Sequence, residues 1–151
     1  MNLQMEINSL KQRISELEQQ AKQEQEFPQY GDTYWCINAY GVVSKEIWDG
    51  YDIKKDMLVI GNGFRTEQEA EFAVEKLKVE AELRKFSDSW DLEETQYTFS
   101  FDWELGEFNI EYPDYNQYPN SYYFYSVDDL QQAIETVGRE RIKKYIFGVE
   151  D

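Results

Sequence analysis

The chain has 151 residues, of which 31 are acidic and 15 are basic, and its formal net charge at pH 7 is −16. Nucleic acids and anionic membranes attract proteins through Lys and Arg, so this charge argues against direct binding to either and favours a basic protein partner. No apolar stretch approaches the roughly 20 residues that span a bilayer, and residues 1–23 lack the apolar region of a signal peptide, so we expect a cytoplasmic protein.

The residues that most enzymes and metal sites depend on are scarce. The sequence has no histidine, and its one cysteine, Cys36, lies in an apolar run that predicts a buried thiol. Carboxylate pairs such as Asp102 with Glu104 are more typical of a solvated strand face than of a catalytic or cation site. We therefore expect no catalysis, no cofactor and no metal.

Residues 1–23 carry the heptad pattern of a coiled coil. Isoleucines at the a positions and leucines at the d positions favour a parallel two-stranded coil. Its expected oligomerisation residues are Leu3, Ile7, Leu10, Ile14 and Leu17. In a parallel dimer, Glu6 would face Lys11 and Arg13 would face Glu18, both attractive pairs. A higher oligomer, or a helix lying on its own domain, remains an alternative.

A polar linker, residues 24–32, precedes a globular domain predicted over residues 33–151. Aromatic and β-branched residues predict strands between residues 33 and 64. One of these strands is the short apolar run Met57–Ile60, which is followed by a Gly61-Asn62-Gly63 turn. Thr66 and Glu69 form a capping box, which predicts a helix from there to Phe86.

The stretch 86–138 contains twelve acids, fourteen aromatics and no basic residue. Residues 97–104 alternate with period two, which predicts a strand with an aromatic face bearing Trp103 and a polar face bearing Asp102 and Glu104. Residues 108–112 alternate again and complete a hairpin. After the loop 113–120, residues 121–125 predict a strand. Ser126 then predicts the cap of a helix that Gly138 ends, and the basic segment 139–144 leads into an apolar tail.

Residues around the two predicted helices match at a constant offset of sixty. Phe64, Thr66 and Ala70 correspond to Phe124, Ser126 and Leu130. We interpret the globular part as two pseudo-repeats, each with strands followed by a helix. The predicted fold class is α+β, an antiparallel sheet with covering helices, preceded by the coiled-coil helix.

The stretch from Gly61 to Phe72, with Glu75–Val79 and Ala81–Leu83, resembles a group of small accessory proteins from phages and prophages of Gram-positive bacteria. The ending Val137-Gly138, Arg141–Tyr145 and Phe147-Gly148 is similar to the end of the same group. The resemblance covers most of residues 33–149 and implies a phage accessory protein that acts in the host cell. Many such proteins interfere with host defence, including CRISPR nucleases.

These observations predict an acidic inhibitor that occupies the basic surface of a host defence nuclease or another nucleic-acid-binding protein. Carboxylates would replace phosphates, and aromatic rings would stack on Arg. The candidate partner-binding residues are Asp102, Glu104, Glu107, Glu111, Tyr112, Asp114, Tyr115 and Tyr118. The alternatives are an assembly protein that acts through its coil, and a small-ligand sponge in which a basic rim at Arg139, Arg141, Lys143 and Lys144 holds a nucleotide.

Overall fold

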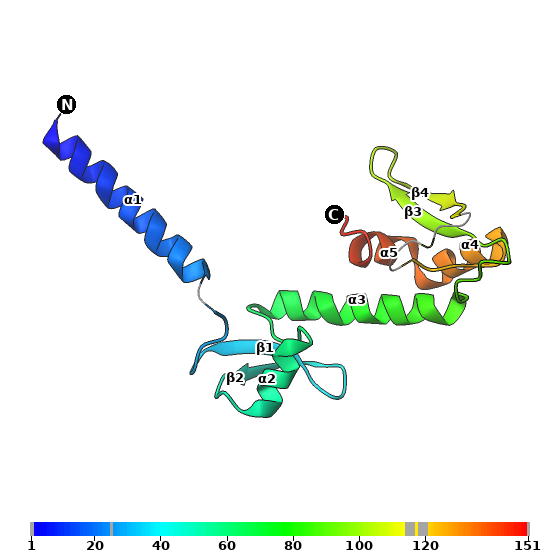
Figure 1. Cartoon of the computed structure of the whole chain (residues 1–151), viewed down its shortest axis with the longest axis horizontal. Coiled ribbons are helices and arrows are strands. Elements are labelled where there is room, and N and C mark those ends of the chain that lie inside the picture. The colour runs from blue at the N-terminus through cyan, green and yellow to red at the C-terminus, as the bar shows by residue number, and fades with distance from the viewer. Residues whose placement is uncertain (1, 25, 114–116, 118–120, 151) are drawn as a thin grey trace. The chain divides into compact units, whose positions relative to one another are not determined.

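The computed structural model describes residues 2–24, 26–113, 117 and 121–150, and within them the chain is α+β (Figure 1). Five helices and four strands are described, and the strands form two small two-stranded antiparallel sheets. The chain divides into two compact units. The N-terminal unit comprises Met1–Cys36 with Ser44–Thr66, and the C-terminal unit comprises Ile37–Val43 with Glu67–Asp151.

The predicted N-terminal helix is present as α1, which spans Leu3–Glu24. Its last turn carries Lys22, which suits the negative end of the helix dipole. The apolar residues at the heptad positions of α1 are exposed along its whole length. Of the described helices, none is long and apolar enough to cross a membrane.

The strands β1 (Thr33–Ile37) and β2 (Val43–Ile47) form the first sheet, and most of their residues belong to the N-terminal unit. The Asn38 carboxamide closes their turn by accepting hydrogen bonds from the Tyr40 and Val42 N–H groups at 2.9 and 3.1 Å. Tyr34 is buried and meets the Trp48 ring edge-on at 6.0 Å between centroids. Cys36 is buried as predicted, with an exposed fraction of 3%.

The strand predicted over residues 57–60 is wrong, because most of this run belongs to helix α2, which spans Asp52–Val59. The Gly61 N–H donates to the Leu58 carbonyl and the Asn62 N–H to the Met57 carbonyl, both at 2.9 Å. With Gly61 at a φ of +80°, these two bonds form the Schellman motif that ends a helix. A four-residue apolar run has no decisive periodicity, so the flanking residues decide its structure.

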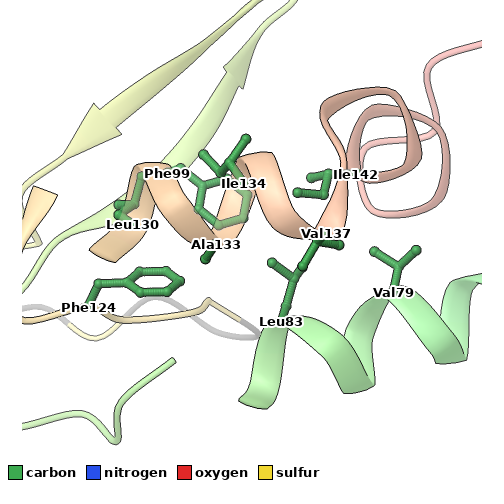
Figure 2. Close-up of a cluster of buried hydrophobic side chains, with 9 residues drawn as sticks. All are labelled: Val79, Leu83, Phe99, Phe124, Leu130, Ala133, Ile134, Val137 and Ile142. Atoms are coloured by element: carbon green, nitrogen blue, oxygen red, sulfur yellow. The ribbon is translucent and has the colours of Figure 1, made fainter. Parts of the chain in front are cut away.

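The predicted central helix is confirmed as α3, which spans Glu67–Phe86 in the C-terminal unit. Its Val79 and Leu83 side chains are fully buried against α4 (Val127–Val137) and α5 (Arg139–Tyr145). In Figure 2 these two side chains point towards Val137 and Ile142. This face of α3 therefore forms part of the core.

The second hairpin of the sequence is also confirmed, as β3 (Thr98–Asp102) paired with β4 (Glu107–Glu111). The predicted strand at 121–125 reduces to two isolated antiparallel bridges, Asp88 with Tyr123 and Tyr97 with Phe124. Phe124 is fully buried and, with Phe99 and Leu130, completes the core in Figure 2.

The signals around the last two helices act as the sequence predicts. The Asp129 N–H donates to the Ser126 hydroxyl at 3.0 Å, which caps α4. Gly138 ends α4 with a φ of +110°. The segment after it, predicted only as basic, is the helix α5. The apolar tail packs back on the core through Tyr145 and Phe147.

Candidate functional site

The β3–β4 hairpin carries four of the eight predicted partner-binding residues. Its register places Thr98 opposite Glu111, Ser100 opposite Asn109, and Asp102 opposite Glu107. Opposed residues of an antiparallel pair share a face, so these six side chains form the polar face. The residues between them, Phe99, Phe101, Phe108 and Ile110, form the aromatic face.

The aromatic face is turned towards the C-terminal helix and tail. The Phe147 ring lies 5.7 Å from Phe101 and 6.0 Å from Phe108, measured between centroids. Two α5 cations lie above the same rings, with Arg139 5.8 Å from the Phe108 centroid and Lys143 5.9 Å from that of Phe101. The polar face of the hairpin consequently points away from α5.

Asp102, a predicted partner-binding residue, is used by the hairpin itself. One of its carboxylate oxygens accepts the Glu104 and Leu105 N–H groups at 2.9 and 3.0 Å. These hydrogen bonds hold the pKa of the Asp102 carboxyl below its ordinary value of 3.8. The Asn109 side chain is a further hydrogen-bond donor to Asp102, so the carboxylate organises the turn rather than standing open to a partner.

Glu111 and Tyr112 are likewise partly engaged within the protein. The Ser100 hydroxyl donates to the Glu111 carboxylate at 2.8 Å. The Tyr112 hydroxyl donates to that of Tyr97 at 3.1 Å, and their rings meet edge-on at 4.6 Å. The hydrogen bond with Tyr97 raises the pKa of Tyr112. Tyr112 nevertheless keeps an exposed fraction of 57%.

The tip of the hairpin is the most open part of the site. Glu104 and Glu107 are exposed and form no ion pair with any described residue. Trp103, predicted to lie on the buried face, has an exposed fraction of 64%, and Leu105 one of 70%. The alternation stops at Asp102, where β3 ends, so the Trp103 ring only meets the edge of Phe101 at 5.3 Å. We call residues 103–107 the hairpin tip.

Three of the predicted partner-binding residues lie outside the described part of the chain. They are Asp114, Tyr115 and Tyr118. The structure thus places four of the eight, Asp102, Glu104, Glu107 and Glu111, on one hairpin, with Tyr112 directly after it. It also adds two exposed apolar residues, Trp103 and Leu105, that the period-two pattern assigned to the core or to a turn.

The basic segment after Gly138 is paired rather than open. Arg139 contacts Glu135 at 2.6 Å, and Lys143 contacts Glu140 at 3.2 Å. Arg141 forms two 2.9 Å hydrogen bonds to the Glu82 carboxylate. The rim proposed for a nucleotide therefore has most of its cations occupied by acids of the same chain.

Two side chains of the N-terminal unit, Cys36 and Lys54, are held in their less nucleophilic forms. Burial raises the pKa of the Cys36 thiol, and the negative charge of Glu46 adds to this effect. Lys54 donates to the Asp49 carboxylate at 2.7 Å and to the Ile47 carbonyl at 2.8 Å. The hydrogen bond to Asp49 raises the pKa of Lys54, which keeps the ammonium protonated. This ion pair ties α2 to the end of β2.

Metal ligands do not converge in the part of the chain that the structure describes, where no group of three or more Asp, Glu, Cys or His side chains is placed to hold an ion. Comparison with known proteins finds no family model, no curated protein and no solved structure that matches this chain.

Proposed function

We propose that the protein is a non-catalytic, acidic inhibitor that binds the basic surface of a nucleic-acid-binding host protein through its β3–β4 hairpin. The observation that carries this proposal is the hairpin tip. Trp103 and Leu105 are exposed there beside Glu104 and Glu107, whose carboxylates form no ion pair with a described residue, while Asp102 holds the turn in place.

Electrostatics supports a basic partner. The chain has an excess of sixteen negative charges, which steers it towards positive surfaces and away from phosphates. Surfaces that bind DNA or RNA are rich in Arg and Lys, and carboxylates can take the places of phosphate groups there. The acids of the tip would meet the rim of such a surface.

The apolar residues of the tip would supply the packed contact area at the centre of an interface, which charge alone does not provide. Trp is among the residues most enriched at the energetic centres of protein interfaces, and its ring stacks well on an Arg guanidinium. An exposed Trp and an exposed Leu with two glutamates beside them would fit into an apolar depression whose border carries Arg or Lys. We place Trp103 and Leu105 at the centre of the contact and Glu104 and Glu107 at its edge.

The phage resemblance supports a counter-defence role, in which the target is a defence nuclease such as a CRISPR effector. Several residues that carry the resemblance serve the fold. Gly61 and Asn62 end α2, and Arg141 joins α5 to α3. The resemblance therefore bears on the scaffold, while the hairpin tip carries the proposed contact.

We also propose that the globular part arose from two copies of one unit. Each half begins with a hairpin whose turn is closed by an Asx side chain, Asn38 or Asp102, that accepts backbone N–H groups. Phe64 forms an antiparallel bridge with Trp35 in β1. Phe124, sixty residues later, forms one with Tyr97, the residue before β3. A helix begins three residues later in both halves.

A small-ligand binder is the second candidate, and a specific hollow favours it. In the C-terminal unit a depression of about 560 Å³ is lined by Lys76, Arg84 and Tyr122, among others. Neither cation forms an ion pair with a described residue, although Glu80 lies in the same lining. Mass spectrometry of the purified protein would reveal a co-purified nucleotide, and substitution of Lys76 and Arg84 by Gln would then release it.

The experiment for the first proposal compares two variants with equal charge. The protein is used to capture partners from a lysate of a Gram-positive bacterium, and the captured protein is purified for affinity measurements. Glu104→Gln with Glu107→Gln should weaken this binding at least tenfold. Glu93→Gln with Glu94→Gln removes the same charge from the exposed loop before β3 and should leave it within about twofold. Equal effects of the two pairs would reject a contact at the hairpin tip.

A further inference from the structure

The apolar stripe of α1 has no cover in the described chain. The exposed fractions of its five heptad residues range from 42% for Ile7 to 75% for Leu3. The next heptad position, Ala21, is exposed as well. Scattered apolar residues on a surface need no explanation, but a continuous stripe along a helix marks a binding face.

The helix is also of a length that needs a partner. At 22 residues it extends for about 33 Å, and isolated helices of this size are only marginally stable in water. Its side-chain bonds are local and exposed, such as Arg13 with Glu16 at 3.3 Å, and pairs of this kind add only a few tenths of a kcal/mol. Association through the stripe would stabilise it.

We infer that a second copy of this chain covers the stripe, in a parallel two-stranded coiled coil. Isoleucine at a and leucine at d is the combination that favours two parallel strands. The charges beside the stripe agree, because a parallel pair places Glu6 opposite Lys11 of the other copy and Arg13 opposite its Glu18. Two copies give four such attractive pairs.

An antiparallel pair is disfavoured by the same residues. The only antiparallel register that pairs all six apolar positions sets Leu3 opposite Ala21 and Leu10 opposite Ile14. In this register Arg13 faces Arg13 of the other copy, and Lys11 faces Lys11. Like charges at these flanking positions repel, so charge selects the parallel arrangement.

A parallel coil has a functional consequence, which rests on the function proposed above. Both copies of α1 end at Glu24 on the same side of the coil, so both copies of the remaining chain leave from that side. The dimer would carry two hairpin tips. Two linked contacts can exceed the affinity of one by about a hundredfold or more when both engage together.

The oligomeric state is measured on the full-length protein by light scattering and sedimentation equilibrium. We expect a mass of twice 18.1 kDa for the natural sequence and of 18.1 kDa for Leu10→Asp. Gln12→Asp changes charge by the same amount on the outward face of the helix and should remain dimeric. A monomeric natural protein, a trimer or tetramer, or a dimeric Leu10→Asp variant would overturn the inference.

Strand direction is tested by cross-linking. Leu3→Cys places a thiol at the first d position, where a parallel coil sets it against its own copy and an antiparallel coil sets it against Ala21. Oxidation of the parallel coil should join the two facing thiols in a disulfide-linked dimer. The native Cys36 is buried and should not take part. Gln12→Cys, on the outward face, should not cross-link. A dimer in which Leu3→Cys fails to cross-link would overturn the parallel arrangement. Both tests are independent of any binding partner, so they can fail while the proposed function stands.

Discussion

Arg141 on α5 donates two parallel hydrogen bonds, each 2.9 Å long, to the carboxylate of Glu82 on α3, although the two residues lie 59 positions apart. The same guanidinium donates a third bond, at 2.8 Å, to the Val137 carbonyl near the end of α4. One side chain thus joins three helices at the edge of the core. This fork geometry is available to Arg and not to Lys.

Arg141→Lys should therefore destabilise the protein even though it preserves the charge. Because 37% of each side chain is exposed, we expect a loss of about 1 kcal/mol in the free energy of unfolding, well below the value of a buried pair. Arg139→Lys is the matched control, since its pair with Glu135 joins residues only four positions apart and both side chains are largely exposed, so it should cost under about 0.5 kcal/mol. Urea denaturation measures both, and equal losses would contradict the special role of Arg141.

The ion pair also predicts a pH dependence. The hydrogen bonds from Arg141 hold the pKa of Glu82 below its ordinary value of 4.5. A carboxyl whose pKa is lowered by folding stabilises the native state above its unfolded pKa, and this contribution is lost as the pH falls through the folded pKa. The stability difference between the natural protein and Glu82→Gln should thus be positive at about pH 7 and shrink below about pH 4. Subtracting the free energies of unfolding of the two proteins removes the effect of the many other acids, which both share. A difference that stays constant with pH would contradict the prediction.

Thr98 on β3 offers a test of polar burial. It has an exposed fraction of 3%, and its hydroxyl has no hydrogen-bond partner among the described residues. Thr98→Val removes the desolvated hydroxyl at constant shape, so stability should stay the same or rise by about 1 kcal/mol. Ser100→Ala, two residues along the same face, breaks the bond to Glu111 and should cost about 1 kcal/mol. A clear loss of stability in Thr98→Val would contradict this account of the strand.

Replacing Trp103 should weaken partner binding while leaving the free energy of unfolding nearly unchanged. Because most of its ring is exposed, Trp103→Ala should change the free energy of unfolding by less than about 1 kcal/mol. The affinity of this variant for the captured partner should fall by about thirtyfold. This corresponds to about 2 kcal/mol, the loss expected for a residue at the energetic centre of an interface. Phe99→Ala is the contrast, since Phe99 lies in the core and its loss should cost about 3–5 kcal/mol. Unchanged affinity in Trp103→Ala would remove Trp103 from the contact.

Local signals in the sequence predicted much of the fold. The cap at Ser126, the stop at Gly138 and the alternation through β3 each depend on neighbours a few residues away. The long helix α3 was equally clear from the capping box predicted at Thr66 and Glu69. Such features can be predicted because the interactions that form them are contained in a short segment.

The errors occur where longer-range or finer detail decides. Met57-Leu58 joined a helix because Gly61 and Asn62 complete its C-terminal hydrogen bonds, which the apolar run alone does not indicate. Trp103 fell outside β3 because the Asp102 side chain turns the chain one residue earlier. The short helix α5 packs on residues that are remote in sequence and contacts one of them, Glu82, through Arg141.

The candidate site was only partly predictable for the same reason. Composition identified an acidic, aromatic stretch, but it does not distinguish acids that face solvent from those that hold the hairpin. Asp102 and Glu111 proved to be internal acceptors, while Glu104 and Glu107 are open. A polar residue followed by a tight glycine turn, as Asp102 is by Gly106, was the available signal for a structural role.

The most direct test of the central claim is the salt dependence of binding to the captured partner, compared between the natural protein and the Glu104→Gln, Glu107→Gln variant. The account predicts that the affinity of the natural protein falls steeply between about 0.05 M and 0.5 M salt. The variant should bind more weakly at low salt and lose less affinity as salt is added. An affinity that is independent of salt, or the same for both proteins, would contradict an acidic hairpin that occupies a basic surface.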